Sequence, residues 1–133
     1  MALTQDRNTP TRAGDLISVP MAAGATIYAG AMVVANASGF AAPGSTATGK
    51  TYLGRAENAE DNTGGADGDI SLQVRRGMAF QFKNDGSDPV TQASLGKVCY
   101  IVDDETVAAT NGSSTRSAAG TVIGVDADGV WVE

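Results

Sequence analysis

The segment from Gly44 to Thr51, GSTATGKT, matches the nucleotide-binding pattern G-x-x-x-x-G-K-[ST] in full. In that pattern backbone N–H groups hold phosphate oxygens, while the lysine and the hydroxyl reach phosphate and Mg²⁺. A functional copy needs a buried strand before it and a helix after it, because the helix N-terminus contributes to anion binding. Here Pro43 closes a weakly apolar stretch, and Gly54 interrupts a following segment with no helical stripe. We therefore expect an exposed loop without bound phosphate.

Two acidic segments, residues 103–105 (DDE) and 126–129 (DADG), carry the carboxylates that Ca²⁺ prefers. Neither has the spacing of an EF-hand loop or a distal bidentate glutamate, and both are typical of hairpin turns. A glycosidase would need two carboxylates across a cleft, next to a ring that could support a sugar. Trp131 is the one tryptophan. We interpret it as a ring at a sheet edge or in the core, with a sugar platform as the alternative.

The chain has no histidine and a single cysteine, Cys99. These counts exclude Ser–His and Cys–His catalysis, histidine-ligated metals and an intrachain disulfide. Cys99 lies in an apolar run, so we expect it to be a small buried side chain. The sequence thus predicts no enzyme, no catalytic residue, no cofactor and no metal.

The formal net charge is −6, which argues against binding to nucleic acid. No window of 18 apolar residues occurs, so a transmembrane helix is not expected. The first residues contain no apolar core of a signal peptide. We therefore expect no nucleic-acid partner and no membrane, and a protein that is made inside a cell and leaves it, if at all, by lysis.

Most of the chain consists of short apolar runs separated by Gly, Asn, Asp, Ser and Pro. Residues 70–75 alternate apolar and polar side chains, which is typical of a half-buried strand. Residues 98–102 form a continuous apolar run, which predicts a central strand buried on both faces. No helical apolar stripe persists for ten residues, so the predicted fold is all-β, a small sandwich or barrel of short antiparallel strands. The expected strands are 16–19, 26–28, 32–35, 40–42, 52–56, 70–75, 78–83, 98–102, 106–108, 121–125 and 130–133.

Residues 1–14 are polar and show neither helical nor strand periodicity, so we expect an extended arm, followed by a single β domain at 15–133. Leu3, Arg7, Pro10 and Arg12 are the arm residues spaced to anchor an extended segment against another protein subunit. Only 5% of the residues of the whole chain are aromatic, and much of its apolar content is alanine. Such a core buries little area per residue, which suggests that the protomer assembles with copies of itself.

From about Gly14 to Glu133 the chain resembles the small head decoration, or cement, proteins of tailed bacteriophages. The resemblance is carried, in this order, by residues 23–34 (AGATIYAGAMVV), 52–58 (YLGRAEN), 70–77 (ISLQVRRG), 95–104 (LGKVCYIVDD) and 119–126 (AGTVIGVD). These are strand–glycine–strand patterns, and none is a catalytic signature.

The resemblance implies an all-β structural protein of the virion that binds and stabilises the outer surface of the expanded capsid. Its implied partners are the major capsid protein and copies of itself, commonly as a homotrimer, and it would be made in the cytoplasm of a bacterial host. It implies no enzyme activity and no functional residue to transfer. A carbohydrate- or surface-binding β module of a virion fibre is the alternative function.

Overall fold

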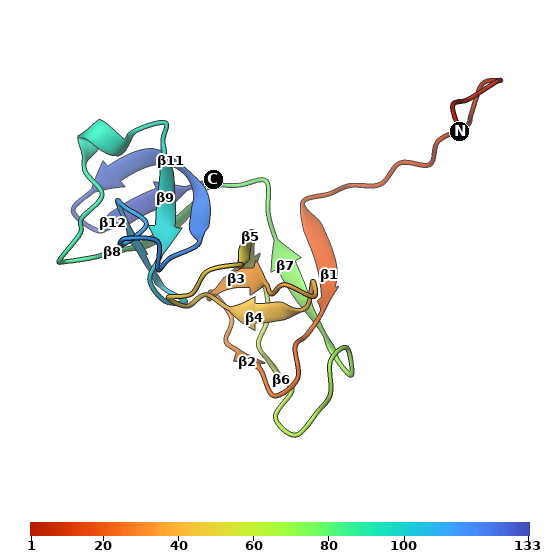
Figure 1. The fold of residues 1–133 in the computed structure, drawn as a ribbon, viewed down its shortest axis with the longest axis horizontal. Helices are drawn as coiled ribbons and strands as arrows, with labels where there is room; N and C mark the ends of the chain where they lie inside the picture. Colours follow the sequence, from red (N-terminus) through yellow and green to blue (C-terminus); the bar gives the residue numbers. More distant parts are fainter.

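The computed structural model describes residues 1–133 and confirms the all-β prediction. Figure 1 shows two β lobes side by side, with the N-terminal segment extending away from one of them. The chain forms twelve strands and a single turn of 3₁₀ helix, η1 (Gln92–Ser94). No helix of the structure has the length and apolar content needed to cross a membrane.

The first lobe, here called the sheet lobe, is an antiparallel sheet in the order β1-β7-β5-β3-β4. A short two-stranded ribbon, β2 with β6, lies at one end of it (Figure 1). The strands of this lobe are β1 (Leu16–Pro20), β2 (Thr26–Ile27), β3 (Met32–Ala35), β4 (Ala41–Pro43), β5 (Thr51–Ala56), β6 (Glu60–Asp61) and β7 (Ser71–Arg75).

The second lobe is a closed barrel in the order β10-β8-β12-β11-β9. Four of its pairings are antiparallel, and β8 with β10 is parallel, an exception to the predicted antiparallel pattern. Closure leaves this lobe without a free sheet edge. Its strands are β8 (Phe80–Asn84), β9 (Val98–Ile101), β10 (Thr106–Ala108), β11 (Ala118–Asp126) and β12 (Gly129–Val132).

Strand β3 belongs to both hydrophobic clusters of the molecule. Side chains alternate across a strand, so Met32 and Val34 enter the barrel cluster while Val33 enters the cluster of the sheet lobe. All three side chains are fully buried. The two lobes are therefore joined through one shared strand as well as through their connections.

The buried interior is small and poor in rings. Of 133 residues 26 are buried, valine is the most frequent of them, and the only buried rings are Phe80 and Phe82. This composition agrees with the thin core expected from the sequence. With few rings, each buried residue contributes less apolar area to stability than in an aromatic core.

The prediction that residues 98–102 are buried on both faces is wrong. Strand β9 ends at Ile101, and its side chains alternate: Cys99 and Ile101 are buried, whereas Val98 is 44% exposed. The strand does lie between two neighbours, β10 and β11. A small barrel has a single interior, so each of its strands buries only one face.

One predicted strand boundary also shifts. β8 begins at Phe80 instead of residue 78, because Gly77 (φ +74°) turns the chain and leaves Met78 exposed. A long turn, residues 62–70, leads from β6 to β7. It is organised by Asn62, a buried side chain whose amide donates to the carbonyls of Ala22 (2.9 Å) and Ala66 (3.0 Å).

Candidate interaction surfaces

The N-terminal arm, residues 1–14, is exposed throughout and contains no strand. Its hydrogen bonds are internal: the Thr9 N–H donates to the Arg7 carbonyl, and the Arg7 guanidinium donates to the Thr9 hydroxyl at 2.7 Å. Leu3, Arg7, Pro10 and Arg12 thus all lie on a segment that has no hydrogen bond to the β lobes. Figure 1 shows this segment extending away from the sheet lobe. Their polar and apolar groups are free to meet a partner.

The arm leads directly into β1, which is an edge strand. The Arg76 N–H donates to Asp15 O, and the Met21 N–H donates to Ile70 O. In this antiparallel register the backbone N–H and C=O groups of the odd-numbered residues of β1 point toward β7. The backbone groups of Leu16 and Ser18 therefore point away from the sheet. Pro20 occupies the same outer register, where its missing N–H costs no ladder bond. The molecule keeps a short open edge beside the arm.

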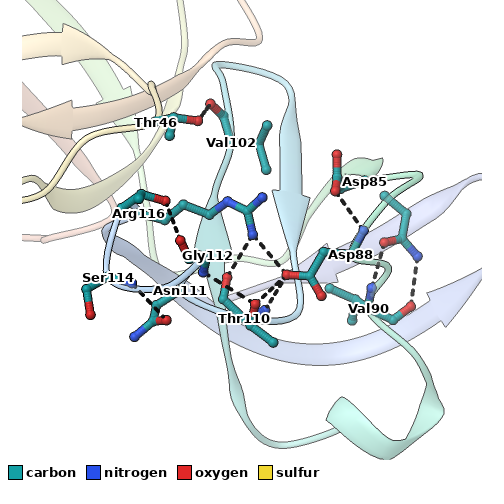
Figure 2. Close-up of polar contacts among 12 residues, drawn as sticks. Thr46, Asp85, Asp88, Val90, Val102, Thr110, Asn111, Gly112, Ser114 and Arg116 are labelled. Atoms are coloured by element: carbon teal, nitrogen blue, oxygen red, sulfur yellow. Dashed lines mark hydrogen bonds and ion pairs between the residues drawn. The ribbon is translucent and has the colours of Figure 1, made fainter.

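In the segment from Gly44 to Thr51, residues 44–50 form a loop and Thr51 begins strand β5, where the pattern requires a helix; most residues of the segment are exposed. The buried Ser117 hydroxyl fixes it, donating to Ala47 O (2.7 Å) and accepting from the Lys50 N–H (3.0 Å). The Thr46 hydroxyl donates to Val102 O at 2.7 Å (Figure 2). The loop fastens the sheet lobe to the barrel.

The first glycine of this loop has a packing explanation. A Cβ on Gly44 would lie 2.9 Å from the Asp103 carbonyl oxygen and 3.2 Å from Ile101 Cγ2. Close approach of the loop to the β9–β10 turn therefore requires glycine here. The phosphate-binding pattern is met by residues that serve the junction between the lobes.

The two acidic segments act as hairpin turns, as expected. Asp126 Oδ1 accepts from the N–H groups of Asp128 (2.9 Å) and Gly129 (3.2 Å), and Asp103 Oδ1 accepts from the Glu105 N–H (2.9 Å). The Trp131 side-chain N–H and these backbone donors hold the pKa of Asp126 below its ordinary value. No group of three or more metal-ligating side chains is gathered anywhere in the structure.

Trp131 is 38% exposed, and its indole Nε1 donates to Asp126 Oδ2 at 3.0 Å. Trp131 lies on the outer face of β12, whereas its neighbours in the strand, Val130 and Val132, are buried on the inner face. It lines none of the five surface hollows of the molecule. Its hydrogen-bond partner Asp126 lines one of these hollows, but the indole ring itself does not.

Figure 2 shows a polar cluster that sequence reasoning missed. Asp88 Oδ2 accepts from the Thr110 hydroxyl (2.5 Å), the Thr110 N–H (3.1 Å) and Arg116 Nη1 (2.9 Å). The Thr110 hydroxyl is the main cause that lowers the pKa of Asp88. The cluster ties the loop before β11 to the loop after β8.

This cluster holds an unusual backbone. Gly112, Ser113 and Ser114 have φ of +62°, +60° and +67°, and the N–H groups of Thr115 and Arg116 both donate to Asn111 O. Two consecutive serines in the left-handed region are rare and cost energy unless the surroundings enforce them. The sequence predicts a polar loop here, but it does not predict that Ser113 and Ser114 adopt the left-handed backbone conformation.

A second arginine cluster lies between the lobes. Glu57 accepts from Arg55 (2.6 Å) and Arg75 (3.2 Å), and Arg75 also approaches Asp15 (3.5 Å). Arg55 stacks over the Phe80 ring at 4.9 Å. The Arg75 guanidinium is therefore paired, because carboxylates that adjoin β1 and β5 lie at the end of β7.

No protein-family model, curated protein or solved structure matches the chain.

Proposed function

We propose that this protein is a structural component of a phage virion that binds the outer surface of the expanded capsid and stabilises it. The observation that carries the proposal is the extended arm, which presents Leu3, Arg7, Pro10 and Arg12 with no hydrogen bond to the β lobes. The sequence resemblance to head decoration proteins supports it. The protein would act without enzyme activity or a cofactor.

Binding to the expanded shell alone gives stabilisation by mass action, since a ligand of one state favours that state. An arm of 14 residues reaches up to about 45–50 Å when extended. Several arms on one oligomer would engage several capsid subunits, and their modest contacts would add through effective concentration. The arginines supply donors for carboxylates of the shell.

Self-association, expected as a homotrimer, is the second part of the proposal. A thin, valine-rich interior supports it, because the isolated chain buries few large side chains. Exposed apolar side chains such as Leu16, Met78 and Val98 are available for an interface. If copies associate, the unfolding midpoint will rise with protein concentration.

The test is co-sedimentation of the purified protein with expanded heads that lack it, and with unexpanded shells of the same capsid protein. We expect saturable binding to expanded heads, and at least about tenfold weaker binding of the Arg7→Glu/Arg12→Glu variant, because two charge-assisted contacts are lost. Lys50→Ala is the matched control and should bind like the original chain. Equal binding to both shells, or none to either, would reject the proposal.

The alternative function, a carbohydrate- or surface-binding module of a virion fibre, would be favoured by an exposed tryptophan within a concave surface. Trp131 is partly exposed but lies outside the surface hollows. No observation at this ring favours the alternative over the capsid proposal.

A further inference from the structure

Tyr28 is the most exposed aromatic side chain of the protein, with 69% of its surface accessible. It follows β2 at a tight turn in which the Ala31 N–H donates to Tyr28 O (3.1 Å) and the Gly30 N–H donates to Ala56 O (2.9 Å). Gly30 has φ +88°, as such a turn requires. The ring is thus held outward by a fixed backbone.

Two surface hollows meet at this ring, and carboxylates line both. One is formed by Tyr28, residues 29–31, Asp104 and Glu105; the other by residues 26–28, Ala59, Glu60 and Asp61. No lysine or arginine lines either hollow. Glu105 is engaged by Lys83 at 2.7 Å, which leaves Asp104 as the unpaired acid of the first hollow.

Backbone contacts from both lobes fix these acids in place. The Met32 N–H donates to Asp104 O at 2.7 Å, which holds the β9–β10 turn against β3. Glu60 stands opposite Ile27 in the β2–β6 ribbon. The hydroxyls of Thr63 and Thr26 donate to Asp61, and together with the Thr63 N–H they keep the pKa of Asp61 low, so it is charged at neutral pH.

An exposed tyrosine ring beside several carboxylates is complementary to a guanidinium, which stacks on aromatic faces and pairs with carboxylates. The arm of the same chain carries two guanidiniums without a carboxylate partner, since the side-chain contact of Arg7 is to the Thr9 hydroxyl. Residues 1–14 contain Arg7, Arg12 and Asp6, which gives the arm a formal charge of +1. Because the whole chain has a formal charge of −6, residues 15–133 have a formal charge of −7. The arm and the domain are therefore electrostatically complementary.

We propose that the Tyr28 surface, defined as Tyr28 with Glu60, Asp61 and Asp104, receives the arm of a second copy of this chain through Arg7 or Arg12. Figure 1 favours a second copy over the same chain, because the arm leaves β1 at the end away from β2 and β6 and runs outward. Reaching its own Tyr28 would require the chain to reverse. The proposal rests on the self-association in the proposed function, and its test needs no heads.

The first test detects contact between two different chains. Cys99 is buried, so a Thr11→Cys chain takes a thiol-reactive spin label at the arm alone. The labelled chain is mixed with ¹⁵N-labelled original chain, and the loss of amide signals is recorded. We expect selective broadening at Tyr28, Ala29 and Glu60. Broadening elsewhere, broadening only when label and ¹⁵N share a chain, or no broadening would each overturn the proposal.

The second test uses association measured by sedimentation of the full chain. Tyr28→Ala should weaken it about three- to fivefold, the size of an exposed cation–π contact, whereas Tyr28→Phe keeps the ring and should change it little. Arg7→Glu/Arg12→Glu should weaken it further, and adding Glu60→Arg/Asp104→Arg should restore it. Failure of this charge exchange to rescue association would overturn the proposal, while binding to heads would still test the proposed function separately.

Discussion

Two ionisable groups, the Cys99 thiol and the Tyr52 hydroxyl, lie against the barrel interior. Burial raises the pKa of the Cys99 thiol to about 12. Burial, and then the charge of Cys99, raise the pKa of the Tyr52 hydroxyl, and the charge of Arg76 opposes them only in part. The Tyr52 oxygen is buried and has no hydrogen-bond partner. An unsatisfied buried hydroxyl costs stability, and its ionised form would cost more.

Cys99 should be unreactive in the folded protein. The thiolate is the reactive form, and neither access nor ionisation favours it here. We expect iodoacetamide at pH 8 to leave the native chain unmodified and to modify it fully in denaturant, as read by mass spectrometry. Modification of the native chain at the rate of a free thiol would show that the thiol is accessible.

Tyr52→Phe should stabilise the fold at pH 7 by about 1 kcal/mol, because it removes an unsatisfied hydroxyl and keeps the ring. The raised pKa values mean that the unfolded chain loses protons first, so the original protein loses stability as pH rises above about 9. The variant should lose less above pH 10. Urea unfolding at pH 7 and pH 10.5 measures both effects; a destabilised variant would contradict this account of Tyr52.

At the scale of strands, turn residues and alternation indicated nearly every element, but pairing partners could not be predicted. The run at residues 98–102 illustrates this limit: its composition fits a fully buried strand, while barrel closure exposes Val98. Gly44 matched the phosphate-binding pattern because the loop that joins the two lobes also needs glycine at this position. Lys50 contributes only its backbone N–H, which donates to Ser117. The Asp88–Arg116 cluster was not predictable, since it joins residues 28 apart and depends on barrel geometry.

Gly54 is a position where strand pairing demands glycine. Its φ is +148°, and a Cβ would collide with the Arg75 carbonyl oxygen where β5 meets β7. Gly54→Ala should therefore cost about 1–3 kcal/mol. Gly86→Ala is the matched control, because Gly86 faces open space and its φ lies outside the left-handed region. Equal stability of the two variants in urea would contradict the assigned pairing.

The arm is the element on which the proposed function depends. Deleting residues 1–14 removes no strand and no hydrogen bond to the lobes, so the circular dichroism spectrum of the domain should be retained. The rise of the unfolding midpoint with protein concentration should diminish, because the arm is the proposed contact between copies. Binding to expanded heads should weaken by several kcal/mol, mainly through faster dissociation. A truncated protein that occupies heads with unchanged lifetime would show that the arm is only a tail.

At the scale of the whole molecule, an acidic two-lobed domain carries a weakly basic arm and a thin interior divided into two clusters. The sequence predicted the all-β class and the thin core from composition and spacing alone. It did not predict the division into a sheet lobe and a barrel, because that division depends on β3 serving both clusters. The Tyr28 surface was likewise hidden, since its carboxylates come from β6 and from the β9–β10 turn.

The central claim is that this protein binds expanded phage heads and stabilises them. The most direct measurement is the temperature at which DNA-filled heads lacking the protein release their DNA, recorded with a DNA-binding dye at increasing protein concentration. We expect a release temperature that rises and then saturates as the sites fill, and that rises less with the Arg7→Glu/Arg12→Glu variant. A release temperature that stays constant at saturating protein would contradict it.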